Sequence, residues 1–402
     1  MEFKKYAMSE LISDISMGPF GSNIKKENYT YTGVPYLNGS NLTGFALNET
    51  QFNYVSEEKA DTLGRSVAHK GDVLVTHRGT LGQIAYIPEN SKFSRYVTGN
   101  SQFRFTCNDL VLPQFIVYYF HTPMGQLKLL SNASQVGVPA LARPTSTFQK
   151  LEVEIPTVDA QYKICDLLHC LQKKIATNQK INDNLELQAQ AFFQELFVDN
   201  ADPEWAIGII SDLGAVVGGS TPSKAKPEYY TETGIAWITP KDLSVNKSKF
   251  ISHGENDITE LGLKNSSATI MPEGTVLFSS RAPIGYIAVA AGEVTTNQGF
   301  KSIVPKPEIG TAFVYYFLKH NLPIIEGMAS GSTFKEVSGS TMKGVPAVIP
   351  DTDTIARFND FCSPIFAQQR ILEEQNRSLA ALRDNLLPKL MSGEIDVSDI
   401  DL

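Results

Sequence analysis

The sequence is poor in cysteine and has no long apolar run. Its 402 residues include only four cysteines, and Cys165 and Cys170 are spaced for neither a disulfide nor a zinc site. We expect all four, including Cys107 and Cys362, to be small apolar residues in a reducing compartment. No apolar stretch approaches the length of a bilayer span, and the chain starts on a polar segment without a signal peptide. These absences predict a cytoplasmic protein with no membrane association.

Motifs that carry catalysis are missing as well. There is no Walker A loop, no GxGxxG opening a helix, no GxSxG, no HExxH and no paired CxxC. There is also no Asn/Asp-Pro-Pro-aromatic tetrapeptide of amino-methyltransferases and no clear Asp…Glu-x-Lys nuclease site. The six histidines are scattered along the chain. We therefore predict a non-catalytic protein that binds no metal or cofactor itself, and a self-sufficient methyltransferase or nuclease is disfavoured.

The net charge of −8 argues at first against a nucleic-acid-binding protein. The charge is unevenly spread, however. The first 156 residues carry 14 basic and 13 acidic side chains, whereas residues 351–402 carry 5 basic and 10 acidic ones. A nearly neutral block can still present a basic face, so the charge permits DNA binding without predicting it.

Two long segments of helical periodicity organise the chain. Between residues 159 and 197 apolar residues recur in alternating steps of four and three, and the rhythm returns 194 residues later. Such a helix would be about 60 Å long. The pattern predicts two long helices packed as an antiparallel coiled coil, with the polar pair Asn182 and Asn376 setting register and orientation. The predicted spacer positions are Ile175, Asn182, Leu185, Leu372, Asn376 and Leu379.

Each long helix follows a block of similar length, and the two blocks are copies. GDVLVTHRGTLGQIAYI at 71–87 parallels GTVLFSSRAPIGYIAVA at 274–290, and QFIVYYF at 114–120 parallels TAFVYYF at 311–317. A repeat of this length is a domain duplication rather than a solenoid. Short β-branched runs, such as 73–75 and 276–278, predict strands. We also expect a helix at 113–130 and again at 311–327, and helix N-caps at Asp159 and Asp353.

The predicted fold class is therefore α+β. Two pseudo-repeated β-rich domains are separated by two long helices that pack together. We place the domains at residues 1–157 and 201–351, the central helix at 158–200, and the distal helix with its tail at 352–402.

The blocks carry side chains suited to reading nucleic acid. Asn and Gln pair with adenine, Arg and Lys with guanine, and Ser or Thr with phosphate. Arg78 and Arg281 share a repeat position just after a strand and are candidate phosphate contacts, although a solvated surface arginine is an equal alternative for each. Similar strands with different loop residues suit one fold reused for two targets. The other candidate DNA-binding residues are Asn38, Ser40, Asn41, Asn100 and Gln102, and in the second block Thr239, Lys241, Asp242, Asn297 and Gln298.

The order block, helix, block, helix, with GDVLVTHRG in the first block and an Ile-Pro pair before each helix, resembles the specificity subunit of type I restriction–modification systems. The likeness extends from residue 10 to KLMSGEIDV at 389–397. It implies that each block is a target recognition domain and that the helices are spacers that dock two methyltransferase subunits. S-adenosylmethionine, and ATP with Mg²⁺, would then be bound by methyltransferase and restriction subunits. At the junctions, Ala160-Gln161 keeps only the Gln of the family's usual Glu-Gln pair, and Thr354-Ile355 keeps neither.

The expected function is that of a non-enzymatic specificity subunit that reads a bipartite, asymmetric site with a fixed gap on double-stranded DNA. An antiparallel helix pair would relate the two blocks by an approximate two-fold axis, so each would read one half-site in the opposite strand sense. The alternative is an interaction scaffold whose helices assemble partners and whose blocks bind protein without reading DNA. A salt-insensitive, sequence-indifferent complex would favour this alternative.

Overall fold

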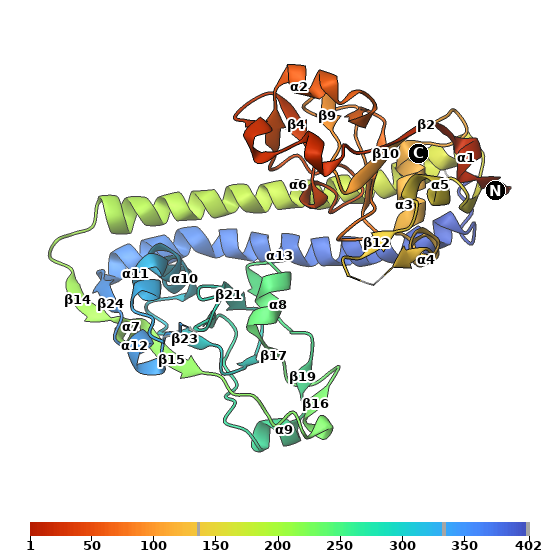
Figure 1. Cartoon of the computed structure of the whole chain (residues 1–402). Helices are drawn as coiled ribbons and strands as arrows, with labels where there is room; N and C mark the ends of the chain where they lie inside the picture. The colour runs from red at the N-terminus through yellow and green to blue at the C-terminus, as the bar shows by residue number, and fades with distance from the viewer. Residues whose placement is uncertain (135–136, 332–334, 399–402) are drawn as a thin grey trace. The chain divides into compact units, whose positions relative to one another are not determined.

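The computed structural model describes residues 1–134, 137–331 and 335–398. The chain forms two compact units: unit 1 comprises Met1–Lys174 with Ser378–Leu402, and unit 2 comprises Ile175–Arg377. The two longest helices, α6 (Val158–Gln194) and α13 (Thr352–Met391), contribute to both units (Figure 1). Helix α6 continues as a π-helical turn at Glu195–Asp199. No helix of the described ranges is both long and apolar enough to cross a membrane.

Within unit 2 the two long helices run antiparallel. Asn178 Nδ2 donates a hydrogen bond to Asn376 Oδ1 at 2.9 Å, and Gln369 Nε2 donates to the Asn182 carbonyl at 3.2 Å. Further along α6, the Phe192 ring lies 4.5 Å from that of Phe361. Partner numbers on α13 fall as positions on α6 rise, which confirms the predicted pairing of the long helices.

The six predicted spacer residues are buried to different depths. Leu372 and Asn182 are buried, whereas the other four, Ile175, Leu185, Asn376 and Leu379, are half-buried. Asn182 and Asn376 do not face each other, because Asn376 meets Asn178 and Asn182 lies beside Gln369. The polar positions of the two helices are therefore staggered: Asn376 bonds to Asn178, one turn before its repeat counterpart Asn182, and the Asn182 backbone carbonyl bonds to Gln369.

The first turns of the two long helices differ from the prediction in their N-caps. Helix α6 begins at Val158 and α13 at Thr352, so Asp159 and Asp353 lie in the first turn and the predicted N-caps are wrong. Asp351 caps α13 instead, since its Oδ1 accepts from the Thr354 backbone N–H at 2.8 Å. The hydrogen bonds from Thr354 lower the pKa of the Asp351 carboxyl. The two first-turn aspartates still suit the positive end of the helix dipole.

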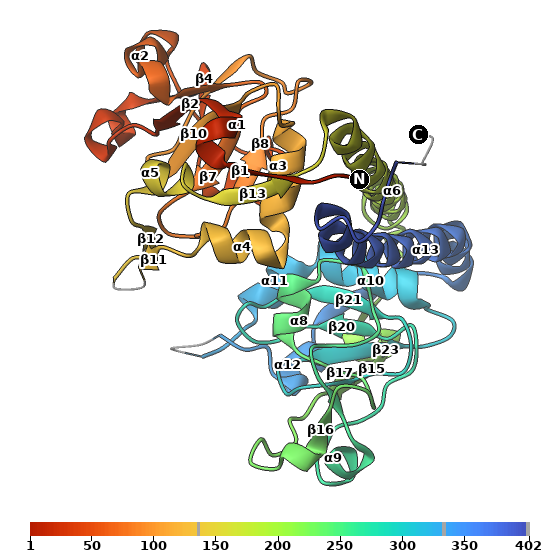
Figure 2. The ribbon, with the colours of Figure 1, turned by 90° about the vertical axis from the view of Figure 1, so that its right-hand side faces the viewer.

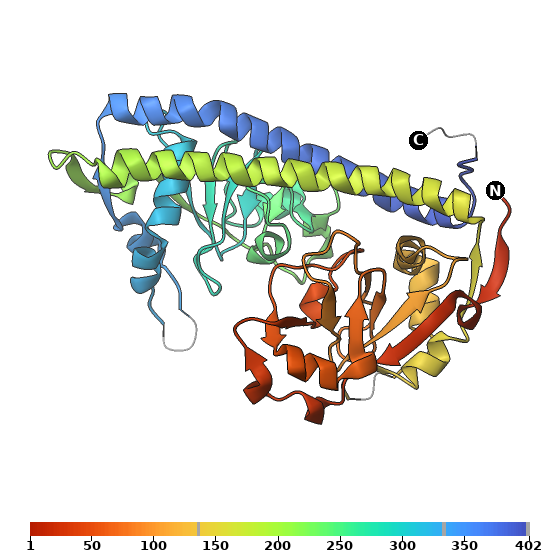
Figure 3. The same ribbon diagram turned by 90° about the horizontal axis from the view of Figure 1, so that it is seen from above.

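The described residues of unit 1 form two sheets and two strand pairs. The central sheet is antiparallel, in the order β2 (Ile12–Met17), β10 (Gln102–Cys107), β7 (Val73–Thr76), β8 (Ile84–Tyr86). The outer sheet runs β3 (Tyr29–Thr30), β5 (Asn53–Val55), β4 (Val34–Tyr36), β9 (Arg95–Val97), β6 (Val67–His69). Strand β1 (Lys4–Ala7) pairs with β13 (Glu152–Ile155), as Figure 3 shows, and β11 (Ala133–Ser134) with β12 (Ala140–Leu141). The short helices are α1 (Met8–Leu11), α2 (Glu57–Thr62), α3 (Pro113–His121), α4 (Pro123–Leu129) and α5 (Pro144–Phe148).

Unit 2 repeats this plan. Its main sheet runs β15 (Gly214–Gly218), β23 (Lys301–Pro305), β20 (Val276–Phe278), β21 (Ile287–Ala290), β18 (Phe250–Ile251). The strand pairs are β14 (Ala206–Ile209) with β24 (Pro346–Ile349), β16 (Tyr230–Thr231) with β19 (Asp257–Ile258), and β17 (Trp237–Ile238) with β22 (Thr295–Thr296). The helices are α7 (Ile210–Leu213), α8 (Pro240–Val245), α9 (Glu260–Lys264), α10 (Thr311–His320), α11 (Leu322–Gly327) and α12 (Gly339–Lys343). Helix α10 lies between the main sheet and α13 (Figure 2). The α+β class is confirmed.

The helices predicted at 113–130 and 311–327 are each broken in two, at Thr122 and at Asn321. In unit 1 the break follows from Pro123, which lacks a backbone N–H and disfavours a helical residue before it. Thr122 Oγ1 then accepts from the Gly125 backbone N–H at 3.0 Å and caps α4. A side chain at Gly125 would lie 2.1 Å from the Tyr119 carbonyl oxygen, so only glycine fits the turn.

Gln161 fastens α6 to the first domain. Its buried amide donates to the carbonyls of Leu110 and Pro156, both at 3.0 Å, and accepts from the Leu112 backbone N–H at 2.9 Å. In unit 2 the repeat position holds Ile355. One turn later, Asn359 Nδ2 donates to the Ile309 carbonyl at 2.9 Å. The two junctions therefore use different amides for the same task.

We expect Gln161→Leu to lower the free energy of unfolding of unit 1 by about 2 kcal/mol, because it leaves one buried and two partly buried backbone groups unpaired. Urea unfolding of the full chain measures the loss. Asn359→Leu is the matched control in unit 2 and should cost less, since it removes a single bond to a backbone group. Equal losses of unfolding free energy in the two variants would contradict the assignment of Gln161 as the stronger contact between helix and domain.

Candidate nucleic-acid interface

Four predicted residues of the first domain meet around one concave surface. Asn38 follows β4, Arg78 follows β7, and Asn100 and Gln102 flank the start of β10. They line two adjoining cavities, of about 530 and 400 Å³, that share Arg78 and Asn100. We call these two cavities the first hollow. Because each residue stands at a strand end, the central and outer sheets fix the position of all four.

Asn38 and Asn41 have the same chemistry but different surroundings. Asn38 is exposed, and its Oδ1 accepts from the backbone N–H of Ser40 at 2.8 Å and from its hydroxyl at 2.6 Å. The Asn38 amide nitrogen bonds to no described residue, which leaves it available as a donor. Asn41 is 1% exposed, and its amide bonds to the backbone of Asn38, Asn48 and Gln51. Asn41 therefore holds the loop that presents Asn38 and the exposed Ser40.

Asn100 and Gln102 differ in the same way. Asn100 is exposed, and its backbone N–H donates to Tyr36 Oη at 3.2 Å. Gln102 is 1% exposed, and its Oε1 accepts from the Gly99 backbone N–H at 3.0 Å. Gln102 Nε2 is buried without a partner in the described part of the chain. Asn100 can thus reach a ligand directly, whereas Gln102 shapes the wall of the hollow.

Arg78 is exposed, and its guanidinium makes no hydrogen bond or ion pair with any described residue. Its loop is nevertheless well fixed. The Gly79 backbone N–H donates to the Pro139 carbonyl at 2.9 Å, and that of Leu141 donates to the His77 carbonyl at 2.8 Å. These bonds place Ala140 directly opposite Arg78. A positive charge is therefore held at the hollow without an intramolecular carboxylate.

In the second domain, Thr239, Lys241, Asn297 and Gln298 line a cavity of about 650 Å³, which we call the second hollow. Thr239 follows β17 and Asn297 follows β22, which pair in parallel. Asp242 lies behind them at the repeat position of Asn41. Its carboxylate accepts from the Thr239 backbone N–H and hydroxyl, at 2.7 and 2.6 Å, and from the Glu255 backbone N–H. Asp242, like Asn41, holds the loop at the edge of the hollow.

The exposed groups of the second hollow have partners within the domain. Lys241 Nζ lies 2.6 Å from Glu255 Oε2, and this carboxylate raises the pKa of the lysine. Gln298 accepts a hydrogen bond from the Thr221 hydroxyl, and Asn297 Oδ1 accepts from the Gly299 backbone N–H at 2.8 Å. Exposed contacts of this kind contribute little stability, so a ligand can replace them at low cost.

Arg281 does not line the second hollow. Its Nε lies 3.1 Å from Glu336 Oε2, and Glu336 stands opposite Arg281 where the first domain has Ala140 opposite Arg78. Lys301 Nζ lies 3.9 Å from the same carboxylate. The two arginines thus share a repeat position, but Arg281 is paired with an acid, whereas Arg78 has no such partner among the described residues.

The sequence reasoning missed an exposed aromatic ring at the first hollow. Phe20 lines it beside Arg78 and is 82% exposed. The sequence does indicate an exposed ring here, because a phenylalanine between Pro19 and Gly21 cannot belong to the core of a strand. At the second hollow the rings of Tyr230 and Trp237 pack edge to face, 5.6 Å apart. Aromatic rings beside basic and amide groups suit contact with nucleic acid.

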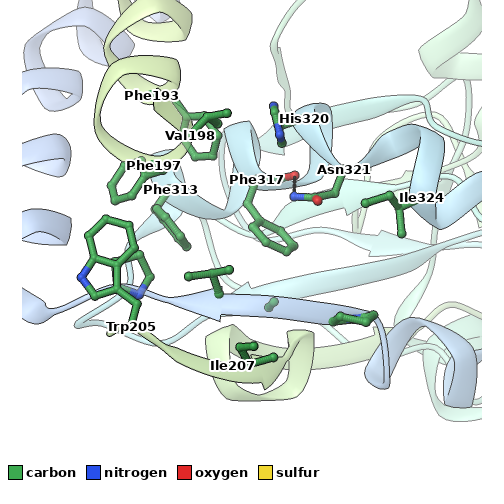
Figure 4. A pocket seen from close by; sticks show the side chains of 14 residues that line it. Phe193, Phe197, Val198, Trp205, Ile207, Phe313, Phe317, His320, Asn321 and Ile324 are labelled. Carbon is green, nitrogen blue, oxygen red and sulfur yellow. Dashed lines mark hydrogen bonds between the residues drawn. The ribbon is translucent and has the colours of Figure 1, made fainter. Parts of the chain in front are cut away.

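Another cavity of unit 2, of about 380 Å³, has a different character (Figure 4). It lies between the end of α6, α10 and the β14–β24 pair, and Phe193, Phe197, Phe313 and Phe317 contribute to its walls. Its lining contains no Lys, Arg, Asp or Glu and none of the predicted DNA-binding residues. Apolar walls of this kind do not recognise a nucleic acid. Across the described ranges, no three His, Cys, Asp or Glu side chains gather as a metal site.

A family model described as the type I restriction modification DNA specificity domain matches residues 13–187 and again residues 203–380. The chain belongs to this family. It is a DNA specificity subunit of a type I restriction–modification system, and as such it is non-catalytic. The double match confirms the predicted duplication into two target recognition domains.

Individual relatives agree with this assignment. The specificity subunit of the type I restriction enzyme MjaIX of Methanocaldococcus jannaschii is 39% identical over 191 residues, which cover 45% of this chain and 44% of that relative. The chain thus spans less than half of it. The HindI specificity subunit of Haemophilus influenzae is 24% identical over 98% of this chain and 100% of its own. The crystal structure of the type I S subunit from M. genitalium shares the fold, with a TM-score of 0.59, 17% identity and coverage of 97% and 96%.

Proposed function

We propose that this specificity subunit reads a bipartite, asymmetric site on double-stranded DNA, with a fixed gap between the half-sites. The observation that supports this most is the pair of hollows built on corresponding strands but lined by different side chains. The first offers Asn38, Arg78 and Asn100, and the second offers Thr239 and Lys241. Different donors and acceptors on one scaffold select different bases. Each domain would then read its own half-site, and the paired helices would set the gap.

The proposal assigns three roles to the candidate residues. Direct readers are the accessible side chains, namely Asn38, Ser40, Asn100, Thr239, Lys241, Asn297 and Gln298. Loop supports are Asn41, Gln102 and Asp242, whose polar groups are engaged within the domains. Phosphate contacts are Arg78 and Arg281. In sequence, the recognition domains would occupy residues 1–157 and 201–351, with spacers at 158–200 and 352–402.

Two methyltransferase subunits are the proposed partners of the long helices. Leu187 and Ile181 on α6, and Ile371 and Leu382 on α13, are exposed although they are large and apolar, and Leu187 reaches 64% exposure. Exposed apolar side chains on a helix are expected where a partner covers them. S-adenosylmethionine would be bound by these methyltransferase subunits, and ATP with Mg²⁺ by restriction subunits. A DNA target places the action of the complex in the cytoplasm.

The deciding experiment is a single-molecule methylome of cells that express the methyltransferase subunits with this chain, without it, or with an Asn38→Ala/Asn100→Ala variant. One split motif should carry adenine methylation on both strands only when the intact chain is present. The variant should lose the motif or relax its first half-site. A methylome indifferent to the chain would contradict the proposal and favour a scaffold that does not read DNA.

Phe20→Ala should weaken binding to the identified site about tenfold, or about 1.4 kcal/mol, because the exposed ring would lose its apolar contact with the duplex. The unfolding of the chain should not change, since the ring is exposed. Fluorescence anisotropy with a labelled duplex measures the affinity. Leu127→Ala is the control, because Leu127 is an exposed apolar residue of unit 1 outside the first hollow. Equal losses for the two variants would refute a contact between Phe20 and the DNA.

A further inference from the structure

Phe45 and Lys249 occupy the same position in the two recognition domains. The Tyr86 backbone N–H donates to the Phe45 carbonyl at 3.0 Å, and the Val289 backbone N–H donates to the Lys249 carbonyl at 2.7 Å. Tyr86 and Val289 correspond to each other in the repeat. In both units the side chain at this position meets a long helix, but the two side chains have opposite chemistry.

In unit 2 the domain supplies a cation. Lys249 is 7% exposed and forms an ion pair with Glu186 of α6. Its Nζ donates to Gln369 Oε1 at 2.6 Å and lies 4.2 Å from the centre of the Phe366 ring, and both of these residues belong to α13. Lys319 Nζ lies 2.6 Å from the other Glu186 oxygen. The helices thus supply the carboxylate and the ring that a buried lysine requires.

In unit 1 the roles are reversed. The Phe45 ring lies 5.5 Å from the guanidinium carbon of Arg383 on α13. It also packs 4.9 Å from the Tyr118 ring and 4.5 Å from that of His121. Here the domain supplies the ring and the helix supplies the cation.

The residues that contact Phe45 and Lys249 are not repeated between the two long helices. Under the 194-residue repeat of the helices, Arg383 corresponds to Ala189, and Glu186 corresponds to Ala380. A lysine in the place of Phe45 would therefore find an arginine nearby and an alanine where Glu186 stands in unit 2. A phenylalanine in the place of Lys249 would leave Glu186 without its most deeply buried partner.

We infer that these reversed contacts form a docking code that matches each recognition domain to its own place on the two repeated helices. Both places present apolar residues at repeat positions, such as Ile164 with Phe358 and Leu390 with Leu196, so apolar packing alone discriminates weakly between the two domains. A buried charge without its counter-ion is far more costly than a lost apolar contact. The code thus prevents each recognition domain from docking at the other domain's place on the helices while the chain folds. The inference concerns folding and does not depend on how the domains read DNA.

The test starts with Phe45→Lys in the full chain. Phe45 is half-buried, so we expect the Tm of unit 1 to fall by about 5 °C, because the new ammonium group would face Arg383 without a carboxylate. The combination Phe45→Lys/Ala380→Glu/Arg383→Ala copies the arrangement of Glu186 and Ala189 and should recover at least half of that loss. Phe45→Leu removes the ring without adding charge, and should cost clearly less than Phe45→Lys.

A reciprocal set in unit 2 keeps the test decisive if Phe45→Lys does not fold. Lys249→Phe should destabilise unit 2, and adding Glu186→Ala with Ala189→Arg should restore much of its Tm. Two results would overturn the inference: Phe45→Lys tolerated as well as Phe45→Leu, or helix substitutions that rescue neither domain variant. Recovery in either unit by the matched helix substitutions supports it.

Discussion

Replacing Glu186 by glutamine should lower the free energy of unfolding of unit 2 by about 3 kcal/mol near neutral pH. Glu186 is the shared counter-ion of the buried Lys249 and of Lys319. Glutamine keeps the shape of the side chain but removes its charge, so the two ammonium groups would face each other without compensation. Urea unfolding of the full chain measures the loss. Glu273→Gln, which breaks an exposed ion pair with Arg370, should change the stability by less than about 1 kcal/mol.

The same contribution should depend on pH. Burial opposes the ionisation of Glu186, but Lys249 and Lys319 outweigh it and lower the pKa to about 2, from an ordinary value of 4.5. Because the folded-state pKa is depressed, the stabilisation is complete above the ordinary value and is lost as the pH falls towards 2. The difference between wild type and Glu186→Gln should therefore shrink as the pH is lowered below 4.5. A difference that stays constant with pH would show that the hydrogen bonds accepted by Glu186, and not its charge, are responsible.

Arg78→Ala is expected to weaken DNA binding about tenfold, and more than Arg281→Ala does. Arg78 has no intramolecular partner among the described residues, whereas Arg281 is paired with Glu336. The loss should be similar for all sequences, and the slope of log affinity against log salt should fall by about 0.9. Anisotropy titrations of the subunit with its methyltransferase partners, over a range of salt concentrations, measure both quantities.

Glu336→Ala provides the matched test in the second domain. Removal of this carboxylate should free Arg281, strengthen non-specific DNA binding and steepen the salt dependence. The double variant Arg281→Ala/Glu336→Ala should lose the gain. Equal effects of Arg78→Ala and Arg281→Ala would contradict the distinction between the two arginines. A loss confined to one half-site would instead make Arg78 a base reader.

The sequence predicted the duplication, the two long helices and the α+β class, because each leaves a regular signal along the chain. Features that depend on neighbouring groups, such as helix caps and side-chain partners, could not be predicted from the sequence. Asp159 and Asp353 fit the composition of an N-cap, but Asp351 caps α13. The predicted helix at 113–130 includes Pro123, although a proline disfavours the helical conformation of the residue before it. The asparagine stagger, with Asn376 against Asn178, depends on the register between the helices, which no single segment encodes.

The candidate interface was likewise predicted in part from the sequence. Strand-end loops with amide and basic side chains could be located in sequence, and four residues from each domain line one hollow. Which amide faces outward could not be predicted, because Asn38 and Asn41 have identical chemistry and differ only in burial. The contrast between Arg78 and Arg281 depends on Ala140 and Glu336, residues more than fifty positions away along the chain. Such pairings arise only when the loops come together.

Each recognition domain starts and ends on a pair of antiparallel strands, β1 with β13 and β14 with β24. Paired strands lie about 4.8 Å apart, so the chain leaves each domain almost where it came in. The polypeptide between the two strands therefore begins and ends at nearly the same point beside the long helices. Insertions or deletions within it alter the reading loops without changing the number of residues in either long helix. If the two domains read separate half-sites as proposed, a new target specificity can arise in one domain while the spacing between the half-sites stays unchanged.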